Sequence, residues 1–444
     1  MSVGVVPSPP GQPARPLTFW MAVALVMGNM IGSGIFLLPA SLARFGGVSL
    51  IGWLISTAGA LMLALVFARL AGIDPASGGP YAYTRRAFGD LAGFLVAWGY
   101  WISMWTSLGA LAVALVGYLA ALVPAITATP AIAAGAAVIA VWSLVAVNVI
   151  GARAAGWVQV VTTVLKLFPL ALVAALGLTH FDSSAFEIDD ASVRTLATSV
   201  PAAATLTLWA FLGLESATVP AGSIERPDIS IPKATLVGTG LVAVVYVAST
   251  VGVMSLVPRE ALSVSTAPFV DAVRTRVGEW AAGAVAAGAA LSCFGALNGW
   301  TLLVGQLPLA VARDGLFPRI FARTSRRDTP AAGLIIAGVL TTALVFLNYT
   351  RALVELFTFF ILLSTLNTLI PYVFSSLALF LLPEGNHRRL PRGIALAAVL
   401  AFAYSIWAMA GSTMARVLSS GRPRRALDVV AGVAFVWLAL KVAF

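Results

Sequence analysis

This sequence predicts an all-α membrane protein with twelve transmembrane helices. Hydrophobic residues make up 60% of its 444 residues and charged residues only 10%, and the mean hydropathy is +0.97. A soluble globular domain carries about 25% charged residues, so the composition excludes that class. Twelve apolar windows, each of about 18 residues or longer, account for the membrane-spanning helices. The chain has one cysteine, Cys293, so an intrachain disulfide is excluded.

The apolar windows follow one another with short connections. They lie at 18–42, 48–70, 91–122, 130–150, 156–178, 196–222, 235–257, 280–308, 331–348, 353–382, 393–412 and 425–443. Residues 1–16 are polar and proline-rich, and we expect a disordered cytoplasmic tail there. The first window is longer than the core of a signal peptide, so we interpret it as an uncleaved helix, although small residues at 40–43 resemble a cleavage site.

Basic residues in the loops predict the orientation of the chain. Most of them fall on the side of the N-terminus, which the positive-inside rule places in the cytoplasm. Twelve spans then put the C-terminus on the same side. The loop at 179–194 is acidic and falls on the opposite side. This bias also accounts for the net charge of +10 without nucleic acid as a partner. The basic residues that fall on the cytoplasmic side include Arg85, Arg86, Arg313, Arg319, Arg323, Arg388 and Arg389. The main exceptions to the rule, which fall on the opposite side, are Arg416, Arg422, Arg424 and Arg425.

Glu215 lies within an otherwise uncharged window, TLTLWAFLGLESATVPAG. A charged group inside a bilayer costs roughly 2.5–3.5 kcal/mol on insertion scales, so such residues line water-filled paths or binding cavities. Gly213, Pro220 and Gly222 flank the acid and indicate that the sixth helix is broken near it. Broken helices are tolerated at membrane depth where their free backbone groups face protein or a polar cavity. The segment therefore predicts the middle of a transport pathway.

The first window contains a second break, in VMGNMIGSGIFLLPA. Gly28, Gly32 and Gly34 each lower helix stability by about 1 kcal/mol relative to alanine. Amide groups freed by unwinding would face a substrate carboxylate at the start of the following half-helix. The alternative is close packing of helices through small residues. Interruptions in spans one and six favour an inverted repeat with a binding site at the membrane midplane.

The repeat assignment divides the chain into four parts. These are the tail at 1–16, a first repeat at 17–178, a second repeat at 195–382, and two additional spans at 390–444.

Other function classes lack the residues they need. The two histidines, His180 and His387, fall in loops on opposite sides, so a histidine-based catalytic site in the bilayer is not expected. No P-loop pattern is present, which argues against ATP-driven pumping. Charge rings typical of channels are also missing. We expect no enzyme activity, no cofactor and no metal. A sensor that shares the transporter fold stays an alternative, and uptake into vesicles would separate the two.

Several ordered motifs resemble the amino acid–polyamine–organocation superfamily, and within it the bacterial arginine/agmatine and putrescine/ornithine antiporters. They are GNMIGSGIFLLPA, DPASGGPYAYTRRAFG, LWAFLGLESA, ERPDISIPKA, STAPF, GWTLLVGQ and DGLFPRIFAR. The resemblance runs from about residue 18 to 412. It implies the five-plus-five inverted-repeat fold of the sodium-coupled leucine transporter, a bacterial inner membrane location, and antiport or permease activity on amino acids or related amines. A homodimer is an assembly that the sequence leaves open.

The resemblance also implies site residues at each break. At the first break it implies that Met30, Ser33 and Gly34 bind the substrate α-carboxylate. At the second it implies Trp209 as an outer gate and the backbone of Ala210 and Leu212 as acceptors for the α-amino group. Free carbonyls at a helix C-terminus suit an ammonium on physical grounds as well.

The remaining implied residues form gates and a side-chain contact. Trp300 matches a middle gate whose ring can lie over a cation, a contact worth roughly 0.5–2 kcal/mol. Tyr100, Glu215 and Tyr372 match an inner gate, and Ser364 matches a hydroxyl that contacts the substrate side chain.

The third span departs from the arginine antiporter. Leu108 stands where that antiporter has an asparagine that holds the guanidinium, and the neighbouring Ser103 and Met104 also differ. We therefore expect weak arginine binding and better binding of a substrate that demands fewer hydrogen bonds.

The fifth span departs as well, because Lys166 lies in the middle of VVTTVLKLFPLALV. This resembles proton-coupled and exchange-type permeases, in which an ammonium replaces the sodium ion of sodium-coupled relatives. A buried ammonium that releases and regains its proton would couple protonation to transport, and Glu215 is the second candidate for this coupling. The alternatives are a static contact, either with Glu215 or with free carbonyls of span one, and snorkelling toward the membrane surface.

Overall fold

The computed structural model describes residues 17–265, 267–325, 328–347 and 353–382. Within these ranges the regular structure is helical, apart from one isolated bridge between Leu17 and Ile224. The all-helical fold class is therefore confirmed for this part of the chain. The expected tail at 1–16 and the last two expected spans, 393–412 and 425–443, lie outside the described residues.

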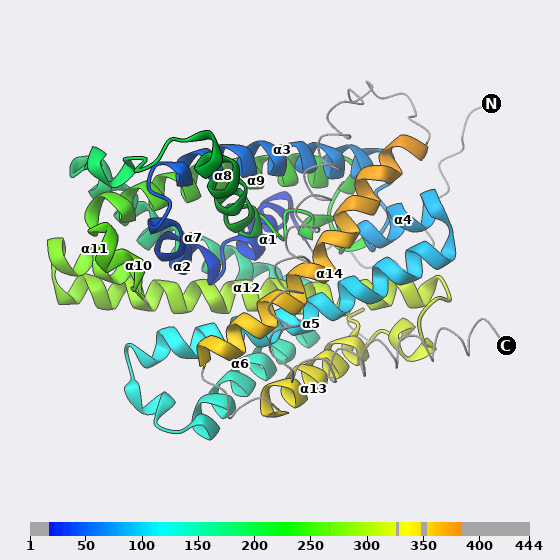
Figure 1. Cartoon of the computed structure of the whole chain (residues 1–444). Coiled ribbons are helices and arrows are strands. Elements are labelled where there is room, and N and C mark those ends of the chain that lie inside the picture. Colours follow the sequence, from blue (N-terminus) through cyan, green and yellow to red (C-terminus); the bar gives the residue numbers. More distant parts are fainter. Residues whose placement is uncertain (1–16, 266, 326–327, 348–352, 383–444) are drawn as a thin grey trace, which may run out of the picture.

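Long helices form a bundle, and the two ends of this bundle lie at the right and at the left of Figure 1. Among the described residues, seven helical segments are long and apolar enough to cross a membrane, counting Phe19–Ala43 as one. The others are α3 (Val48–Ile73), α5 (Asp90–Ala120), α6 (Pro130–Ile150), α7 (Ala152–Thr179), α9 (Pro227–Leu256) and α12 (Glu279–Arg313). The shorter α13 (Ala331–Leu347) is also apolar, and α14 (Leu353–Leu381) crosses α5 and packs against it.

Both predicted breaks are present. α1 (Phe19–Met30) and α2 (Gly34–Ala43) are separated by three non-helical residues. α8 (Val193–Trp209) stops six residues before Glu215, and the chain continues through turns to Ser223. Gly213 takes φ +105°, a backbone conformation that residues with a Cβ rarely adopt. A glycine at this position therefore allows the chain to turn out of the helix beside the acid.

The two ends of the bundle carry different connecting segments. The α1 end, at the right of Figure 1, holds the start of α1 and the short helix α4 (Pro80–Phe88). The α2 end, at the left, holds α10 (Arg259–Ser263) and α11 (Pro268–Val277). Arg259 closes the α2 end, because its guanidinium donates to the backbone oxygens of Ala43 and Arg44 and pairs with Asp189 at 2.7 Å. It thereby caps the free carbonyls at the end of α2.

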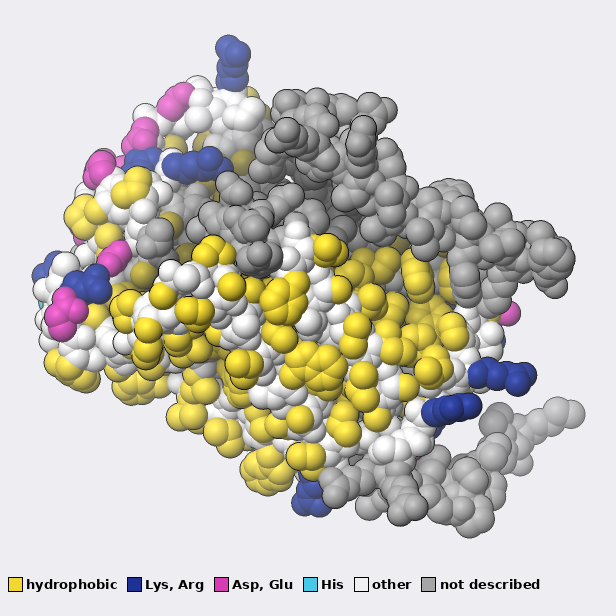
Figure 2. Space-filling model, turned by 90° about the horizontal axis from the view of Figure 1, so that it is seen from below, with side chains coloured by type: hydrophobic (Ala, Val, Ile, Leu, Met, Phe, Trp, Pro, Cys, Tyr) yellow, Lys and Arg dark blue, Asp and Glu magenta, His cyan; other side chains and the backbone are white. Residues whose placement is uncertain are grey.

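The surface has the polarity of a membrane protein. Figure 2 shows hydrophobic side chains across the middle of one face, with charged side chains gathered toward the ends. On α7, Trp157, Val164 and Phe168 are each more than half exposed, whereas Gln159 and Lys166 on the other side of the helix are buried. The helix therefore presents an apolar face to lipid and a polar face to the protein interior.

Buried amides connect three of the long helices. Asn148 on α6 donates to the side-chain oxygen of Asn298 on α12 at 3.2 Å, and Asn298 donates to Gln159 on α7 at 3.0 Å. Gln159 in turn donates to the backbone oxygen of Ala24 in α1 at 3.3 Å. We call Asn148, Asn298 and Gln159 the amide chain. Interhelical hydrogen bonds of this kind contribute about 0.6 kcal/mol each in membrane proteins.

Candidate functional site

A cavity of about 70 Å³ lies where the two broken helices meet α5, α12 and α14. It joins residues that are far apart in the sequence. The lining residues are Asn29, Met30, Gly32, Ser33, Gly34, Ser107, Ala110, Leu111, Trp209, Ala210, Leu212, Trp300, Ser364 and Thr368. We call this cavity the central pocket. Eight of these residues, Met30, Ser33, Gly34, Trp209, Ala210, Leu212, Trp300 and Ser364, are those that the sequence indicated as substrate-binding.

The first break presents backbone amide groups to the central pocket. Ser33 is the N-cap of α2, and its side chain makes no capping hydrogen bond. The first amide groups of a helix have no partner within the helix, so those at the start of α2 stay available to a ligand. They also carry the positive end of the helix dipole. Ser33 and Gly34 line the pocket, so this end of the pocket suits a carboxylate.

Lys166 holds the other half of the first break. It is fully buried, and its Nζ donates to the backbone oxygen of Gly28 at 2.8 Å and to that of Ile31 at 2.6 Å. Ser292 on α12 also donates to the Ile31 oxygen, at 3.1 Å. These carbonyls are free because the helix ends at Met30. Of the two static contacts expected for Lys166, the structure therefore shows the one with free carbonyls of span one.

One hydroxyl group lies between the two breaks. Tyr246 on α9 is fully buried, and its hydroxyl is 2.6 Å from the backbone oxygen of Met30 and 3.1 Å from that of Ala210. A hydroxyl has a single hydrogen, so it serves these two acceptors in turn or shares it between them. Both carbonyls belong to residues that line the central pocket. The Met30 oxygen also accepts from the amide of Gly32 at 2.9 Å, so the Ala210 oxygen is the better acceptor for an ammonium group bound there.

Glu215 is fully buried and bonded to two tyrosines. Tyr100 on α5 donates to one carboxylate oxygen, and Tyr372 on α14 donates to the other. The Tyr372 oxygen also accepts a hydrogen bond of 2.9 Å from the amide of Gly213. The predicted inner-gate trio is therefore in contact. Because both carboxylate oxygens bind tyrosines and Lys166 binds carbonyls, the acid and the lysine do not form an ion pair with each other.

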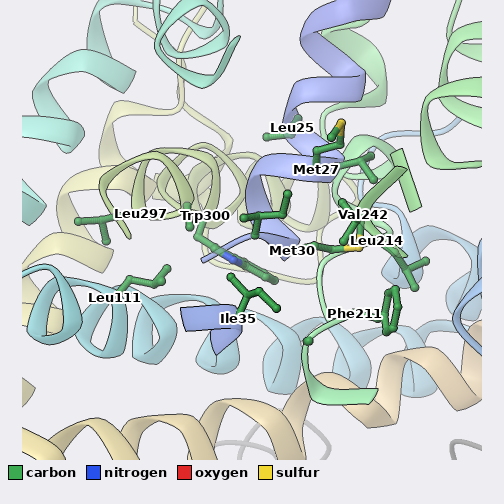
Figure 3. Close-up of a cluster of buried hydrophobic side chains, with 14 of the residues drawn as sticks. Leu25, Met27, Met30, Ile35, Leu111, Phe211, Leu214, Val242, Leu297 and Trp300 are labelled. Atoms are coloured by element: carbon green, nitrogen blue, oxygen red, sulfur yellow. The ribbon is translucent and has the colours of Figure 1, made fainter. Parts of the chain in front are cut away.

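Two tryptophans border the central pocket at the breaks. A Cβ built on Gly34 would lie 2.6 Å from Cη2 of Trp209, so the indole lies directly against the glycine. Trp300 on α12 approaches Gly213 in the same way, at 3.3 Å from its Cζ2. Figure 3 shows the Trp300 indole between Met30 and Ile35. Each ring therefore covers backbone of a broken helix, and the gating roles of both tryptophans stay predictions.

Three hydroxyl groups form one wall of the central pocket. Ser107 on α5 and Ser364 on α14 are 2.5 Å apart, and Thr368 lies one turn beyond Ser364. Ser107 also donates to the backbone oxygen of Ser103 at 2.7 Å, and Thr368 donates to that of Ser364 at 3.0 Å. When the Ser107 hydrogen is directed to its own helix, Ser364 donates to Ser107, and the lone pairs of these hydroxyls face the ligand.

Two of the residues predicted to bind substrate do not line the central pocket. Ser103 is fully buried, and its hydroxyl donates to the backbone oxygen of Tyr100 at 2.7 Å. Leu108 is also fully buried and packs in the hydrophobic core. Ser107 and Leu111 present α5 to the pocket instead. An α-helix turns by about 100° per residue, so a one-residue difference selects another face. The role expected for Leu108 stays a prediction.

A second, larger cavity opens at the α1 end and is charged. Its volume is about 580 Å³, and it is lined by Asp74, Ala76, Ser77, Ala82, Arg85, Arg86, Asp90, Gln306, Leu309, Ala310, Arg313 and Asp314. Arg85 pairs with Asp90 at 2.7 Å and with Asp314 at 2.8 Å. Burial, together with the hydrogen bond that its hydroxyl donates to Asp314, raises the pKa of Tyr81. These contacts fix α4 against the end of α12.

Metal ligands are not clustered in the described ranges. Neither the residues around the central pocket nor any other described residues form a group of three or more His, Cys, Asp or Glu side chains. The chemistry of the central pocket is that of reversible binding by backbone groups, hydroxyls and aromatic rings.

Comparison with known proteins identifies the family. The sequence model of the amino acid permease family matches residues 17–423. The cadaverine/lysine antiporter of Escherichia coli K12 is 37% identical over 341 residues, which are 75% of each chain. The putrescine transporter PotE of the same strain is 31% identical over 362 residues, 81% of this chain and 82% of its own.

A solved structure shows the same fold. The crystal structure of MhsT in complex with L-phenylalanine superposes with a TM-score of 0.65 at 14% sequence identity, covering 88% of this chain and 97% of MhsT. The family model, the two transporter relatives and the helical membrane fold agree, so the chain is a multi-pass membrane transporter and not an enzyme. It belongs to the amino acid permease family of the amino acid–polyamine–organocation superfamily.

Proposed function

We propose that this protein exchanges amino acids or related amines across a bacterial inner membrane by alternating access at the central pocket. The observation that carries the proposal is the meeting of the two breaks. The uncapped start of α2 offers amide groups to a carboxylate, and the backbone oxygens of Met30 and Ala210, which share the Tyr246 hydroxyl, lie at the pocket for an ammonium, with the Ala210 oxygen as its main acceptor. One pocket thus has complementary groups for both ends of an α-amino acid.

The proposal includes an arrangement in the membrane. Spans one to five and six to ten form two inverted repeats, two additional spans follow, and both termini lie in the cytoplasm. The α1 end of the bundle then faces the cytoplasm, and the α2 end faces the periplasm. The acidic loop beside Arg259 lies on the outer side, which agrees with the positive-inside rule.

The pocket wall supports a substrate with a second ammonium group. The three hydroxyls can accept hydrogen bonds from an ammonium group, and the Trp300 ring adds a surface for a cation. Among the described residues that line the pocket, none carries a carboxylate that would hold a guanidinium in a bidentate contact. Relatives are named for cadaverine, lysine and putrescine. Lysine and short diamines are therefore the first substrates to test, with arginine expected to bind more weakly.

Lys166 supports a transport cycle without sodium. Its ammonium already occupies the oxygens of Gly28 and Ile31, which a sodium ion would otherwise coordinate. Deprotonation would remove the charge from both contacts and loosen α7 from the first break. We propose that this step links proton movement, or the binding of a charged counter-substrate, to the change of access.

Uptake into proteoliposomes tests the proposal. We expect radiolabelled lysine to accumulate when the vesicles contain unlabelled cadaverine or lysine, with equal rates in sodium and in choline buffers and with a dependence on pH. A thermal-shift screen of the twenty amino acids and common diamines should reveal the ligands, because binding stabilises the folded state by mass action. The proposal fails if no amine or amino acid is bound or taken up, and its coupling part fails if uptake requires sodium.

A further inference from the structure

The chain that follows the second break is held from two sides at the α1 end. Residues 216–225 contain two short turns, Ser216–Thr218 and Ala221–Ser223, in place of a continued helix. Such a segment has many backbone groups that a helix would satisfy internally. Local turn bonds satisfy some of them, and Ser216 accepts from Asn29, but residues 219–225 also form two sets of hydrogen bonds with distant parts of the chain.

The first set joins the two broken helices to each other. The amide of Leu17 donates to the oxygen of Ser223 at 3.0 Å, and the amide of Glu225 donates to the oxygen of Leu17 at 2.9 Å. These bonds form the parallel bridge between Leu17 and Ile224, whose side chains are buried. Leu17 stands two residues before α1. The start of the first broken helix and the end of the second are therefore tied by backbone.

The second set joins the same segment to the loop before α4. The amide of Gly222 donates to Oγ of Ser77 at 2.8 Å, and the amide of Gly78 donates to the oxygen of Val219 at 2.9 Å. Gly79 takes φ +52°, and a Cβ there would collide with Thr218. We call the contacts of Ser77 and Gly78 with residues 219–222 the latch. Glycine at 79 is what allows this close approach.

The loop of the latch is fixed to the helices on the other side of the central pocket. It leads directly into α4, whose Tyr81 donates to Asp314 at the end of α12 at 2.8 Å. Phe88 of α4 packs edge-on against Phe374 of α14, with ring centroids 5.6 Å apart. α4 also packs along α5. Thus the latch, like the contacts of Glu215 with Tyr100 and Tyr372, crosses from the broken helices to α5, α12 and α14.

A path from the central pocket to the α1 end must separate these two groups of elements. The contacts that cross between them have to open, whereas the bridge between Leu17 and Ile224 lies entirely within one group. We infer that Ser77 and Gly78 close the exit at the α1 end, and that the Leu17–Ile224 bridge makes the inner parts of both broken helices leave this latch together. The inference rests on the proposed alternating access, and it assigns a gating role to Ser77.

Two engineered disulfides test the inference, with opposite expected outcomes. The chain has one native cysteine, Cys293, which is buried. A Cβ on Gly222 would lie 2.7 Å from the Ser77 oxygen, close to the separation of about 3 Å between a Cβ and the far sulfur in a disulfide. The pair Ser77→Cys/Gly222→Cys is therefore well placed to lock the latch. Leu17→Cys/Ile224→Cys tests the bridge, since bridged strands lie about 4.8 Å apart, within the Cα range of disulfides.

We expect oxidation of the Ser77→Cys/Gly222→Cys protein to lower exchange in proteoliposomes at least tenfold, with recovery on reduction. Oxidation of the Leu17→Cys/Ile224→Cys protein should leave the rate within twofold, with intact-mass analysis proving that the bond has formed. Full exchange by the oxidised latch pair overturns the gating role of Ser77. Loss of exchange by the oxidised bridge pair overturns the joint movement.

A second measurement does not depend on transport. Thr218→Cys places a thiol at a fully buried position beneath Gly79. Adding Ser77→Ala should raise the rate at which a water-soluble maleimide labels this thiol at least threefold. Ser49→Ala is the matched control, because it removes a serine hydroxyl that donates to the Gly46 oxygen at the α2 end, and it should change nothing. An unchanged rate in the Ser77→Ala protein overturns the latch, even if the proposed function itself fails in the uptake assay.

Discussion

Replacing Lys166 gives the sharpest test of how the first break is held. In Lys166→Ala, two hydrogen bonds from an ammonium to backbone oxygens are lost, at 2.8 and 2.6 Å. Charged hydrogen bonds contribute about 1.5–3 kcal/mol each, so the arrangement that they hold loses about 3–6 kcal/mol. Ser292 still donates to Ile31, which places the expected loss near the lower figure. A difference of about 3 kcal/mol changes the ratio of two conformations by more than 100-fold.

The thermal stability of the variant should change much less than its transport. Removing a buried ammonium also removes the cost of taking it out of water, which offsets part of the lost hydrogen bonding. We therefore expect Lys166→Ala to be a folded protein that either loses the pH dependence of exchange or stays in one conformation. Lys166→Arg should fail as well, because a guanidinium does not release its proton in the accessible pH range.

Exchange rates from pH 5 to 9, measured in proteoliposomes with and without sodium, check this expectation. Lys233→Ala is the control, since that lysine is exposed near the start of α9. If Lys166→Ala exchanges substrate at the parental rate and with the parental pH profile, the lysine has only a structural role and the proposed coupling of protonation to transport is refuted.

Four further substitutions address substrate binding. Trp300→Ala should abolish exchange in a folded protein, because the ring that covers the break and lines the central pocket is lost. Gly34→Ala should weaken binding at least tenfold by isothermal calorimetry, since the new methyl group would overlap the Trp209 indole. Ser107→Ala should lower affinity for diamines about three- to tenfold, because it removes one hydrogen-bond acceptor for the ligand. Leu108→Asn should move substrate preference toward arginine.

Controls for these variants come from positions away from the pocket. Trp157→Ala removes a tryptophan that is 56% exposed on the face of α7, and Gly59→Ala adds a methyl group where no atom lies within 4 Å. Both should behave as the parent. Wild-type exchange by Trp300→Ala would contradict a gating ring, unaltered affinity in Gly34→Ala would contradict close packing at α2, and micromolar arginine binding by the parent would contradict the expected selectivity.

The sequence predicted the breaks because their signals are local. Three glycines within seven residues and an acid followed by proline mark positions where a membrane helix is unstable, and both positions are non-helical in the structure. Lys166 was found for the same reason, as a charge in an apolar window. Its partners followed from the break, because unwound backbone supplies the free oxygens that a buried ammonium needs.

The pocket-facing side of α5 could not be predicted in the same way. This helix is apolar on all sides, and most of it is buried, so its pattern does not reveal which face meets the pocket. The resemblance pointed to Leu108, whereas Ser107 and Leu111 line the cavity. Tyr246 was missed because a tyrosine in an apolar span has no local sign of its partners. The number of spans beyond α14 stays a prediction.

The amide chain has a consequence for which parts of the bundle can move. Each of its amides sits in lipid-excluded protein, where water cannot replace a lost partner. Sliding α12 by one turn would separate Asn298 from both Asn148 and Gln159, and sliding α6 or α7 by one turn would break one of these two hydrogen bonds. The hydrogen bonds of the amide chain therefore hold the three helices in one register along their axes. Any displacement during the cycle must then be taken up elsewhere, at the places where the helices are already interrupted.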